Sequence, residues 1–305
     1  MATSMNVFAL GATGYIGGDA FHVIYNAHPD FSYAVLVRDS SRGALVAAQY
    51  PRARLVYGSL DDEALIEEEA RKASIVCHWA NADHAASARA IILTSLPDAA
   101  PHREVDKIVL EGGTQHAEKV KTAIICPPTI YGPGRGPGNQ RSHQVPELAR
   151  CTLEKGHGIQ VGEGKTFWTS IHVHDLSLLY LSLFRAAVDG HGASRATWGT
   201  EGYYFCEAAD LRGWIESDEV VKYEPEDANK LTPMGAALWG CNSRARAVRA
   251  RKLLGWEPRS PSLDAEIGPT VEVEAKRLGL VVGHAKVAAG DLPTSISNPL
   301  GTLGK

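Results

Sequence analysis

The sequence predicts an α/β fold, with a doubly wound parallel sheet as the larger part and a smaller C-terminal lobe. Short apolar runs alternate with helix-like segments over the first half of the 305-residue chain, as in right-handed βαβ crossovers. A glycine-rich turn joins the first apolar run to the first helical segment. We expect the sheet domain over residues 1–130 and the lobe, with segments returning to the core, over 131–282. The small, polar residues 283–305 predict a disordered tail.

Each apolar run in the first half is short and bounded by turn residues, so it predicts a buried strand. The expected strands are Met5 to Leu10, Tyr33 to Val37, Ala53 to Tyr57, Ser74 to His78 and Thr122 to Cys126. The expected helices between them are Tyr15 to Ala27, Ser41 to Tyr50, Asp61 to Lys72 and Asp83 to Leu93.

The second half is less regular. Ile91 to Ser95 fits either a fifth strand or a helix end, and the segment Val105 to Val120 is helical in spacing although Gly112-Gly113 weakens its middle. The remaining expectations are a loop over Gly132 to Gly138, a strand over Ser170 to Val173, an apolar helix capped by Asp175, and a helix from Arg244 to Leu254.

Composition narrows the function classes. The net charge of −4 does not favour general binding to nucleic acid or to an anionic membrane. The apolar segment Leu176 to Val188 is too short to span a bilayer, and we expect no signal peptide. Five scattered cysteines without a CxxC spacing predict reduced thiols and a cytoplasmic location.

The turn GATGYIG has the spacing G-x-x-G-x-x-G between a strand and a helix, which predicts dinucleotide binding. Gly11 permits the tight turn, Gly14 lets the backbone approach a pyrophosphate, and Gly17 lets the helix pack on the strand. The free N–H groups at the helix start attract the phosphates. The alternative is a glycine-rich turn without a ligand. The predicted cofactor-binding residues of the turn are Gly11, Thr13, Gly14, Tyr15, Ile16 and Gly17.

The residue type at the end of the second predicted strand indicates whether NAD or NADP binds. An acid there suits the ribose 2′-hydroxyl of NAD, and an arginine suits the 2′-phosphate of NADP. Arg38 directly follows the strand, with Arg42 nearby, so NADP is the predicted cofactor. In the alternative, Arg38 is a solvated surface residue and Asp39 takes the ribose of NAD. Asn81, just past the fourth strand, is a predicted cofactor wall because ligands bind outside the carboxyl ends of parallel strands.

The chain resembles the extended and atypical short-chain dehydrogenase/reductases of the NAD-dependent epimerase/dehydratase group, including fungal NAD(P)-binding Rossmann-fold proteins. The resemblance rests on FALGATGYIGG, LVYGSLDD, CPPTIYGPG, HVHDLSLLYL and the late NSRARAVRARKLLGWEP, which together span most of residues 5–258. It implies a Rossmann core, an adenine contact from Asp61 and a place beside the nicotinamide for Pro128. It also implies a small-molecule substrate such as a carbonyl, hydroxyl or nucleotide-sugar compound; a homodimer stays open.

The chain departs from this group in its catalytic residues. The group uses a Tyr-x-x-x-Lys pair, and no such pair occurs here. Lys107 matches the lysine, but the tyrosine position falls on Arg103, which cannot donate its proton at working pH. Only Thr94 or Ser95 can stand in for the group's serine. Tyr131 is a candidate substitute acid; the alternative is a packing tyrosine.

The chain is also short relative to the group between Ala90 and Pro97, and between Phe205 and Glu219, so a strand and a lobe helix can be missing.

Several other residue clusters resemble functional sites but have simpler structural explanations. His172, His174 and Asp175 resemble a metal triad, but the family motif explains them better, and we predict no metal site. Cys126 is expected to be buried. The basic run SRARAVRARK favours a solvated helix face over a nucleic-acid patch, whereas Gln140, Arg141 and His143 are equally placed as substrate contacts or surface residues.

Two functions compete. The first is an NAD(P)-dependent oxidoreductase or epimerase-like enzyme, favoured by the cofactor fingerprint. The second is a non-catalytic regulator similar to the NmrA-like proteins, which bind the dinucleotide without turnover; the missing Tyr-x-x-x-Lys pair favours it. A degenerate relative that has lost segments is a third alternative.

Overall fold

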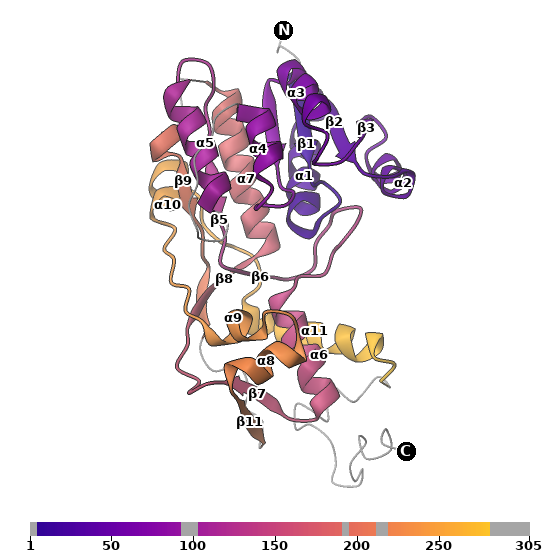
Figure 1. Cartoon of the computed structure of the whole chain (residues 1–305), viewed down its shortest axis with the longest axis vertical. Coiled ribbons are helices and arrows are strands. Elements are labelled where there is room, and N and C mark those ends of the chain that lie inside the picture. The colour runs from indigo at the N-terminus through magenta and orange to yellow at the C-terminus, as the bar shows by residue number, and fades with distance from the viewer. Residues whose placement is uncertain (1–4, 93–102, 191–194, 212–218, 281–305) are drawn as a thin grey trace.

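The chain is described here by a computed structural model that covers residues 5–92, 103–190, 195–211 and 219–280. It is an α/β protein, as predicted, with a parallel sheet and its helices above a second group of helices and short strands (Figure 1). No helix in these ranges is long and apolar enough to cross a membrane. The expected tail over 283–305 lies outside the described residues.

The upper sheet is fully parallel, in the order β3-β2-β1-β4. Its strands are β1 (Asn6–Leu10), β2 (Ser32–Val37), β3 (Arg54–Tyr57) and β4 (Ile75–His78), and the helices between and after them are α1 (Tyr15–Ala27), α2 (Ser40–Gln49), α3 (Glu63–Lys72) and α4 (Ala85–Ile92). These elements confirm the predicted βαβ alternation to within two residues at nearly every end.

Helices cover both faces of this sheet because successive side chains of a strand point to opposite sides. Val7 of β1 packs with Phe21 of α1 and with Phe184, which comes from a later helix. Phe8, the next residue of β1, packs on the other face with Ile66 of α3. This arrangement is the doubly wound core that the apolar runs predict.

The rest of the chain forms three smaller sheets and more helices. The strands are β5 (Ile124–Cys126) paired with β9 (Tyr203–Phe205), β6 (Thr129–Tyr131) with β8 (Trp168–His172) and β10 (Ala209–Leu211), and β7 (Gly158–Val161) with β11 (Val220–Tyr223). The helices are α5 (Arg103–Gln115), α6 (Gln144–Lys155), α7 (Val173–Val188), the 3-10 turn η1 (Gly199–Glu201), α8 (Pro225–Leu231), α9 (Gly235–Gly240), α10 (Val248–Leu254) and α11 (Leu263–Arg277).

Between β4 and β5 the described chain holds the helices α4 and α5 and no strand. Ile91 and Ile92 belong to the end of α4, while residues 93–95, with Thr94 and Ser95, lie outside the described residues. In α5 the glycine pair does not break the helix. A Cβ at Gly113 would collide with the hydroxyl of Thr122, so the glycine permits close packing of α5 against the start of the next strand.

The predicted cap of the apolar helix is wrong. Helix α7 begins at Val173, and its cap is His172, whose Nδ1 accepts the backbone N–H of His174 at 3.1 Å. Asp175 lies inside the first turn and is buried. Its carboxylate accepts the backbone N–H groups of Arg259 (2.9 Å) and Ser260 (3.0 Å), so it joins α7 to the chain after α10.

The helix predicted from Arg244 begins only at Val248. Ser243 donates its N–H to the carbonyl of Phe167 and accepts the N–H of Thr169, each at 2.9 Å. Because these bonds hold the residues before α10 extended beside β8, they cannot form the first turn of the helix.

Replacing Asp175 by alanine should lower the free energy of unfolding by about 2–4 kcal/mol, since the backbone N–H groups of Arg259 and Ser260 lose their buried acceptor. Chemical denaturation monitored by circular dichroism measures this change. The matched control is Asp189→Ala, an exposed acid at the other end of α7, with an expected effect of about 0.5 kcal/mol or less. Equal losses in the two variants would contradict the role given to Asp175.

Candidate dinucleotide-binding site

The glycine-rich turn lies between β1 and α1, and its backbone explains two of its glycines. Gly11 has a φ of +87°, and a Cβ there would lie 2.6 Å from the backbone N of Ala80. A Cβ at Gly17 would collide with the carbonyl oxygen of Gly11 and approach Trp79 to 2.7 Å. The predicted reasons for a tight turn at Gly11 and for close helix packing at Gly17 are therefore confirmed.

Gly14 is the N-cap of α1 and leaves the helix start open. Its φ of −81° and ψ of 171° suit any residue, no side chain caps the helix, and the only atom near an added Cβ is the Gly11 oxygen at 3.2 Å. The first intrahelical bond runs from the N–H of Gly18 to the Gly14 carbonyl. The N–H groups of Tyr15 and Ile16 precede it and have no helical acceptor, so this end of α1 suits an anionic group.

The loop that follows β6 lies directly against this turn. The Tyr15 hydroxyl donates to the Gly132 carbonyl at 2.6 Å, and the N–H of Asn139 donates to the Thr13 carbonyl at 3.0 Å. A Cβ at Gly138 would collide with Thr13. The glycines of the predicted loop thus allow two backbones to touch.

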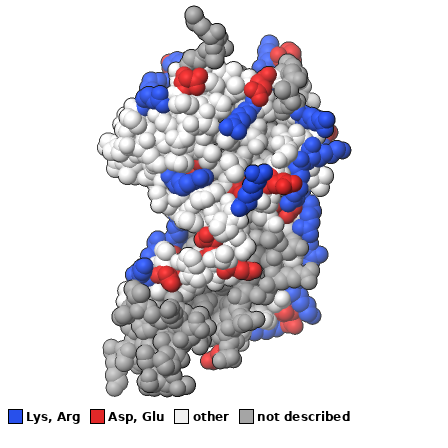
Figure 2. All heavy atoms as spheres, turned by 180° about the vertical axis from the view of Figure 1, so that it is seen from behind, with Lys and Arg blue, Asp and Glu red and all other residues white. Residues whose placement is uncertain are grey.

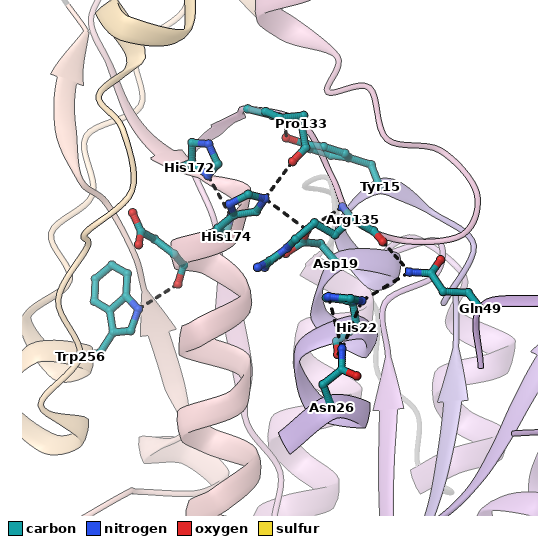
Figure 3. Close-up of polar contacts among 12 residues, drawn as sticks. Tyr15, Asp19, His22, Asn26, Gln49, Pro133, Arg135, His172, His174 and Trp256 are labelled. Carbon is teal, nitrogen blue, oxygen red and sulfur yellow. Dashed lines mark hydrogen bonds and ion pairs between the residues drawn. The ribbon is translucent and has the colours of Figure 1, made fainter. Parts of the chain in front are cut away.

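Asp19 on α1 fixes the loop by an ion pair (Figure 3). Its carboxylate is completely buried and accepts Nε, Nη2 and the backbone N–H of Arg135 at 3.0, 2.6 and 2.8 Å. Burial alone would raise the pKa of Asp19, but the hydrogen bonds and the charge of Arg135 outweigh it and hold the pKa below its usual range. Asp19 is therefore a charged anchor and not a proton acceptor.

A cluster of rings adjoins this anchor. His174 Nε2 lies 3.0 Å from the Pro133 carbonyl, and the rings of His172 and His174 are 4.5 Å apart (Figure 3). His172 is almost wholly buried, and desolvation lowers its pKa to about 4, with His174 adding to the effect. The facing acids are Glu266, whose Oε1 is 3.8 Å from His172 Nε2, and Asp175. His172 is therefore neutral near pH 7.

Three residues that follow β2 have different contacts. Asp39 caps α2: its carboxylate accepts the Arg42 N–H at 2.8 Å and the Ser41 hydroxyl at 2.6 Å. These bonds lower the pKa of Asp39 and engage the carboxylate that the NAD alternative gives to the ribose. Arg42 reaches back to the turn, where Nη1 donates to Thr13 Oγ1 at 3.1 Å, and Arg38 is exposed at the strand end.

The other predicted cofactor residues follow strand ends as expected. Asp61, after β3, is exposed and pairs with His84 Nε2 at 3.0 Å. Asn81, after β4, is exposed and accepts the Asp83 N–H at 3.1 Å. Pro128 is buried between β5 and β6. Because Asp61 and Asn81 follow the carboxyl ends of strands in the sheet that carries the glycine turn, they share its edge; their contacts with a cofactor stay predictions.

The two catalytic candidates come from different elements. Lys107 is half-buried on α5. Tyr131 is buried in β6, its hydroxyl donates to the Pro261 carbonyl at 3.0 Å, and its ring meets His172 edge-on. Burial raises the pKa of Tyr131 above its usual value. This geometry favours the packing alternative for Tyr131.

The residue clusters for which the sequence favours a structural explanation have partners inside the protein. The part of the chain described here contains no cluster of three or more His, Cys, Asp or Glu side chains able to hold a metal. In the basic run, Arg249 pairs with Glu201 and Arg251 with Glu207. Figure 2 shows basic and acidic side chains interspersed over one face. Arg141 pairs with Glu274 and Glu147, both at 2.7 Å, inside the lobe, and Cys126 is half-buried, not fully buried as expected.

Comparisons with known proteins agree with this geometry. No family model matches the chain. Oxidase ucsJ from Acremonium sp is 31% identical over 90% of this chain and 99% of its own length. That alignment extends over 343 residues, more than the 305 of this chain, so the relative contains segments that this chain lacks.

Solved structures share the fold at low identity. The dTDP-glucose 4,6-dehydratase rfbB from Bacillus anthracis, in complex with NAD, has a TM-score of 0.63 at 13% identity and covers 90% of this chain and 97% of its own. The UDP-glucose 4-epimerase from Thermotoga maritima, with UDP-glucose, has a TM-score of 0.60 at 15% identity and covers 90% and 100%.

The parallel sheet, the open glycine turn and these neighbours show that the chain has a Rossmann-like fold, the fold of the epimerases and dehydratases just described. The chain belongs to the family that includes oxidase ucsJ.

The buried His172 predicts an acid-labile fold. Its pKa is about 4 in the folded protein and near 6.5 when unfolded, so the unfolded chain binds more protons between these values. The contribution of neutral, buried His172 to the free energy of unfolding is fully present above pH 6.5. It should fall by up to about 3 kcal/mol as the pH drops towards 4. His172→Asn keeps a capping acceptor but cannot titrate, so its stability should fall less over this range.

Urea unfolding at pH 7, 6, 5 and 4 measures the difference. The matched control is His143→Asn, at an exposed histidine that begins α6, which should follow the wild-type curve. If the His172→Asn curve parallels the wild type throughout, the acid sensitivity has another source.

Proposed function

We propose that this chain is an NAD(P)-dependent oxidoreductase that acts on a small carbonyl or hydroxyl compound. The observation that carries the proposal is the uncapped start of α1, where the N–H groups of Tyr15 and Ile16 stand free of helical acceptors beside Gly14. The family supports it, because its solved neighbours are described in complex with NAD and its relative is named an oxidase.

The preferred cofactor in this proposal is NADP. Asp39 is engaged in capping α2, whereas Arg42 reaches the turn and the exposed Arg38 follows the end of β2. Two arginines suit the extra 2′-phosphate, since guanidinium groups bind phosphate oxygens in pairs. Five free cysteines fit a reducing compartment, and we propose the cytoplasm.

The bound nicotinamide would supply or accept a hydride at the substrate carbon. This chain would hold the pyrophosphate on the turn and shield the ring with the Pro128 segment. The proposal names no residue that donates the proton to the substrate oxygen, because the Tyr131 hydroxyl donates to the Pro261 carbonyl and the Tyr-x-x-x-Lys pair is absent from the sequence. For this reason a dinucleotide-binding regulator without turnover is the second candidate, and steady-state assays with aldehydes and ketones distinguish the two.

Gly14→Ala tests the turn. The substitution meets only one atom at 3.2 Å and requires no unusual φ, so the unliganded stability should change by less than about 1 kcal/mol. The methyl group occupies the space that a pyrophosphate needs, so affinity should fall at least about tenfold. Thermal-shift assays without nucleotide and with NADPH, NADP, NADH or NAD measure the unliganded stability and the affinity. At a nucleotide concentration of about a hundredfold the Kd, the free energy of unfolding of the wild type should rise by roughly 2.7 kcal/mol. A folded wild type that binds none of the four nucleotides refutes the proposal.

Arg42→Ala and Arg38→Ala test the phosphate preference. Each should weaken NADPH by about tenfold and NADH by less than about twofold, because only NADPH carries the 2′-phosphate. Calorimetric titration of both nucleotides measures the ratio. The control is Arg71→Ala, which removes an exposed arginine that pairs with Glu67 on α3. Equal losses for both nucleotides would favour NAD.

A further inference from the structure

The loop after β3 and the loop after β4 meet in a contact between two side chains. Nε2 of His84, which directly precedes α4, lies 3.0 Å from Oδ1 of Asp61, which lies shortly before α3. β3 and β4 are the outer strands in the order β3-β2-β1-β4. The contact therefore connects the two edges of the sheet, on the side where the carboxyl ends of the strands and the glycine turn lie.

Each of these loops starts beside a part of the proposed cofactor site. The N–H of Gly58, directly after β3, donates to the carbonyl of Val37 at 3.1 Å, and Val37 precedes Arg38. The N–H of Trp79, directly after β4, donates at 2.9 Å to the carbonyl of Leu10, the residue before the glycine turn. A nucleotide with its pyrophosphate on the turn and its ribose at the end of β2 would therefore have its base close to both loops.

The ring of His84 is held in one orientation and one tautomer. Its Nδ1 accepts the backbone N–H of Ser87 at 3.1 Å, as in a helix N-cap, and its backbone carbonyl accepts the Ser87 hydroxyl at 3.0 Å. Ser87 is buried, and its hydroxyl lies 2.9 Å from Nε2 of His78 at the end of β4. Because a backbone N–H can only donate, the ring proton of neutral His84 is on Nε2 and faces Asp61.

The carboxylate of Asp61 is held on one side and open on the other. The backbone N–H of Asp61 donates to the Ser59 hydroxyl at 3.1 Å, and its carbonyl accepts the N–H of Glu63 at 3.0 Å. His84 donates to Oδ1, while 85% of the Asp61 side chain stays exposed, so a ligand can reach Oδ2. An ionised carboxylate only accepts hydrogen bonds, so the ligand group that meets it has to be a donor.

We propose that His84 is a positioning residue through which Asp61 selects the base of the nucleotide, with Oδ2 accepting from the 6-amino group of adenine. The proposal rests on the cofactor function proposed above and adds a selectivity to it. Hypoxanthine carries a carbonyl oxygen where adenine carries this amino group, so it would place one acceptor against another. That arrangement loses a hydrogen bond to a charged group and leaves both acceptors unsatisfied.

Calorimetric titration of the wild type with NADPH and with deamino-NADPH, in which hypoxanthine replaces adenine, tests the selection. The two nucleotides have the same phosphates, riboses and nicotinamide, so a difference in affinity comes from the base. NADPH should bind about tenfold more tightly. Equal affinities, or tighter binding of deamino-NADPH, overturn the proposal.

Asp61→Asn should reverse the preference. His84 still donates from Nε2, so it turns the oxygen of the new amide towards itself and leaves the amide N–H groups for the base. These groups can donate to the oxygen of hypoxanthine, so deamino-NADPH should bind about threefold to tenfold more tightly than NADPH. The control Glu63→Gln removes a neighbouring exposed acid and should keep the wild-type ratio. A folded Asp61→Asn that keeps the wild-type preference overturns the proposal.

His84→Asn separates the positioning role from helix capping. Asparagine keeps an acceptor for the Ser87 N–H, so the start of α4 stays capped, but its side chain ends short of the position of Nε2. In the double variant with Asp61→Asn the amide is free to turn, so the two nucleotides should bind within about twofold of each other. A double variant that prefers deamino-NADPH as strongly as Asp61→Asn does overturns the role of His84. Circular dichroism checks that each variant is folded.

The wild-type titration also distinguishes this proposal from the cofactor function on which it rests. Wild type that binds both nucleotides equally overturns the base selection and leaves the cofactor function standing. Folded wild type that binds neither nucleotide overturns the cofactor function, and the role of His84 with it.

Discussion

The buried carboxylate of Asp19 determines how the two parts of this molecule meet. Arg135 surrounds it with three donors, and the loop that carries Arg135 leads from the sheet region into the lobe. Removing Arg135 would leave the Asp19 carboxylate buried without compensation, so the loop has little freedom to lift away from α1. A buried ion pair of this kind contributes more to one defined arrangement than to net stability.

This anchor also holds the segment that joins the glycine turn to the lobe. Residues 128–144 form one continuous segment that begins at Pro128, contacts the glycine turn at Gly132 and Asn139, and ends in α6 at Gln144. The ion pair between Asp19 and Arg135 lies in the middle of this segment and therefore fixes how it runs past α1.

The sequence predicts local features well and distant ones poorly. The roles of Gly11 and Gly17 could be predicted because backbone geometry at a strand-to-helix turn is a local property. The Asp175 cap was predicted wrongly because its true partners, Arg259 and Ser260, lie more than eighty residues further along the chain. Asp19 was missed for the same reason: no periodicity marks a helical acid whose partner is 116 residues away. A pocket in the lobe, lined by uncharged residues, joins side chains from the six elements β6, α6, β7, β8, β11 and α9, so no local pattern in the sequence marks it.

The two halves of the proposed active site differ in completeness. On the side of β1 and β2, the helix start is uncapped and Arg42 reaches the turn, as the proposed dinucleotide binding requires. On the other side, the described residues between β4 and β5 contain no strand, and Arg103 stands where the family resemblance puts the catalytic tyrosine.

The relative's longer alignment shows that chains of this family carry additional segments. In the proposed function, cofactor affinity would depend on backbone amides near Gly14, whereas turnover would depend on a proton donor beyond β4. The two properties are therefore physically separable in this chain, and measuring one does not establish the other.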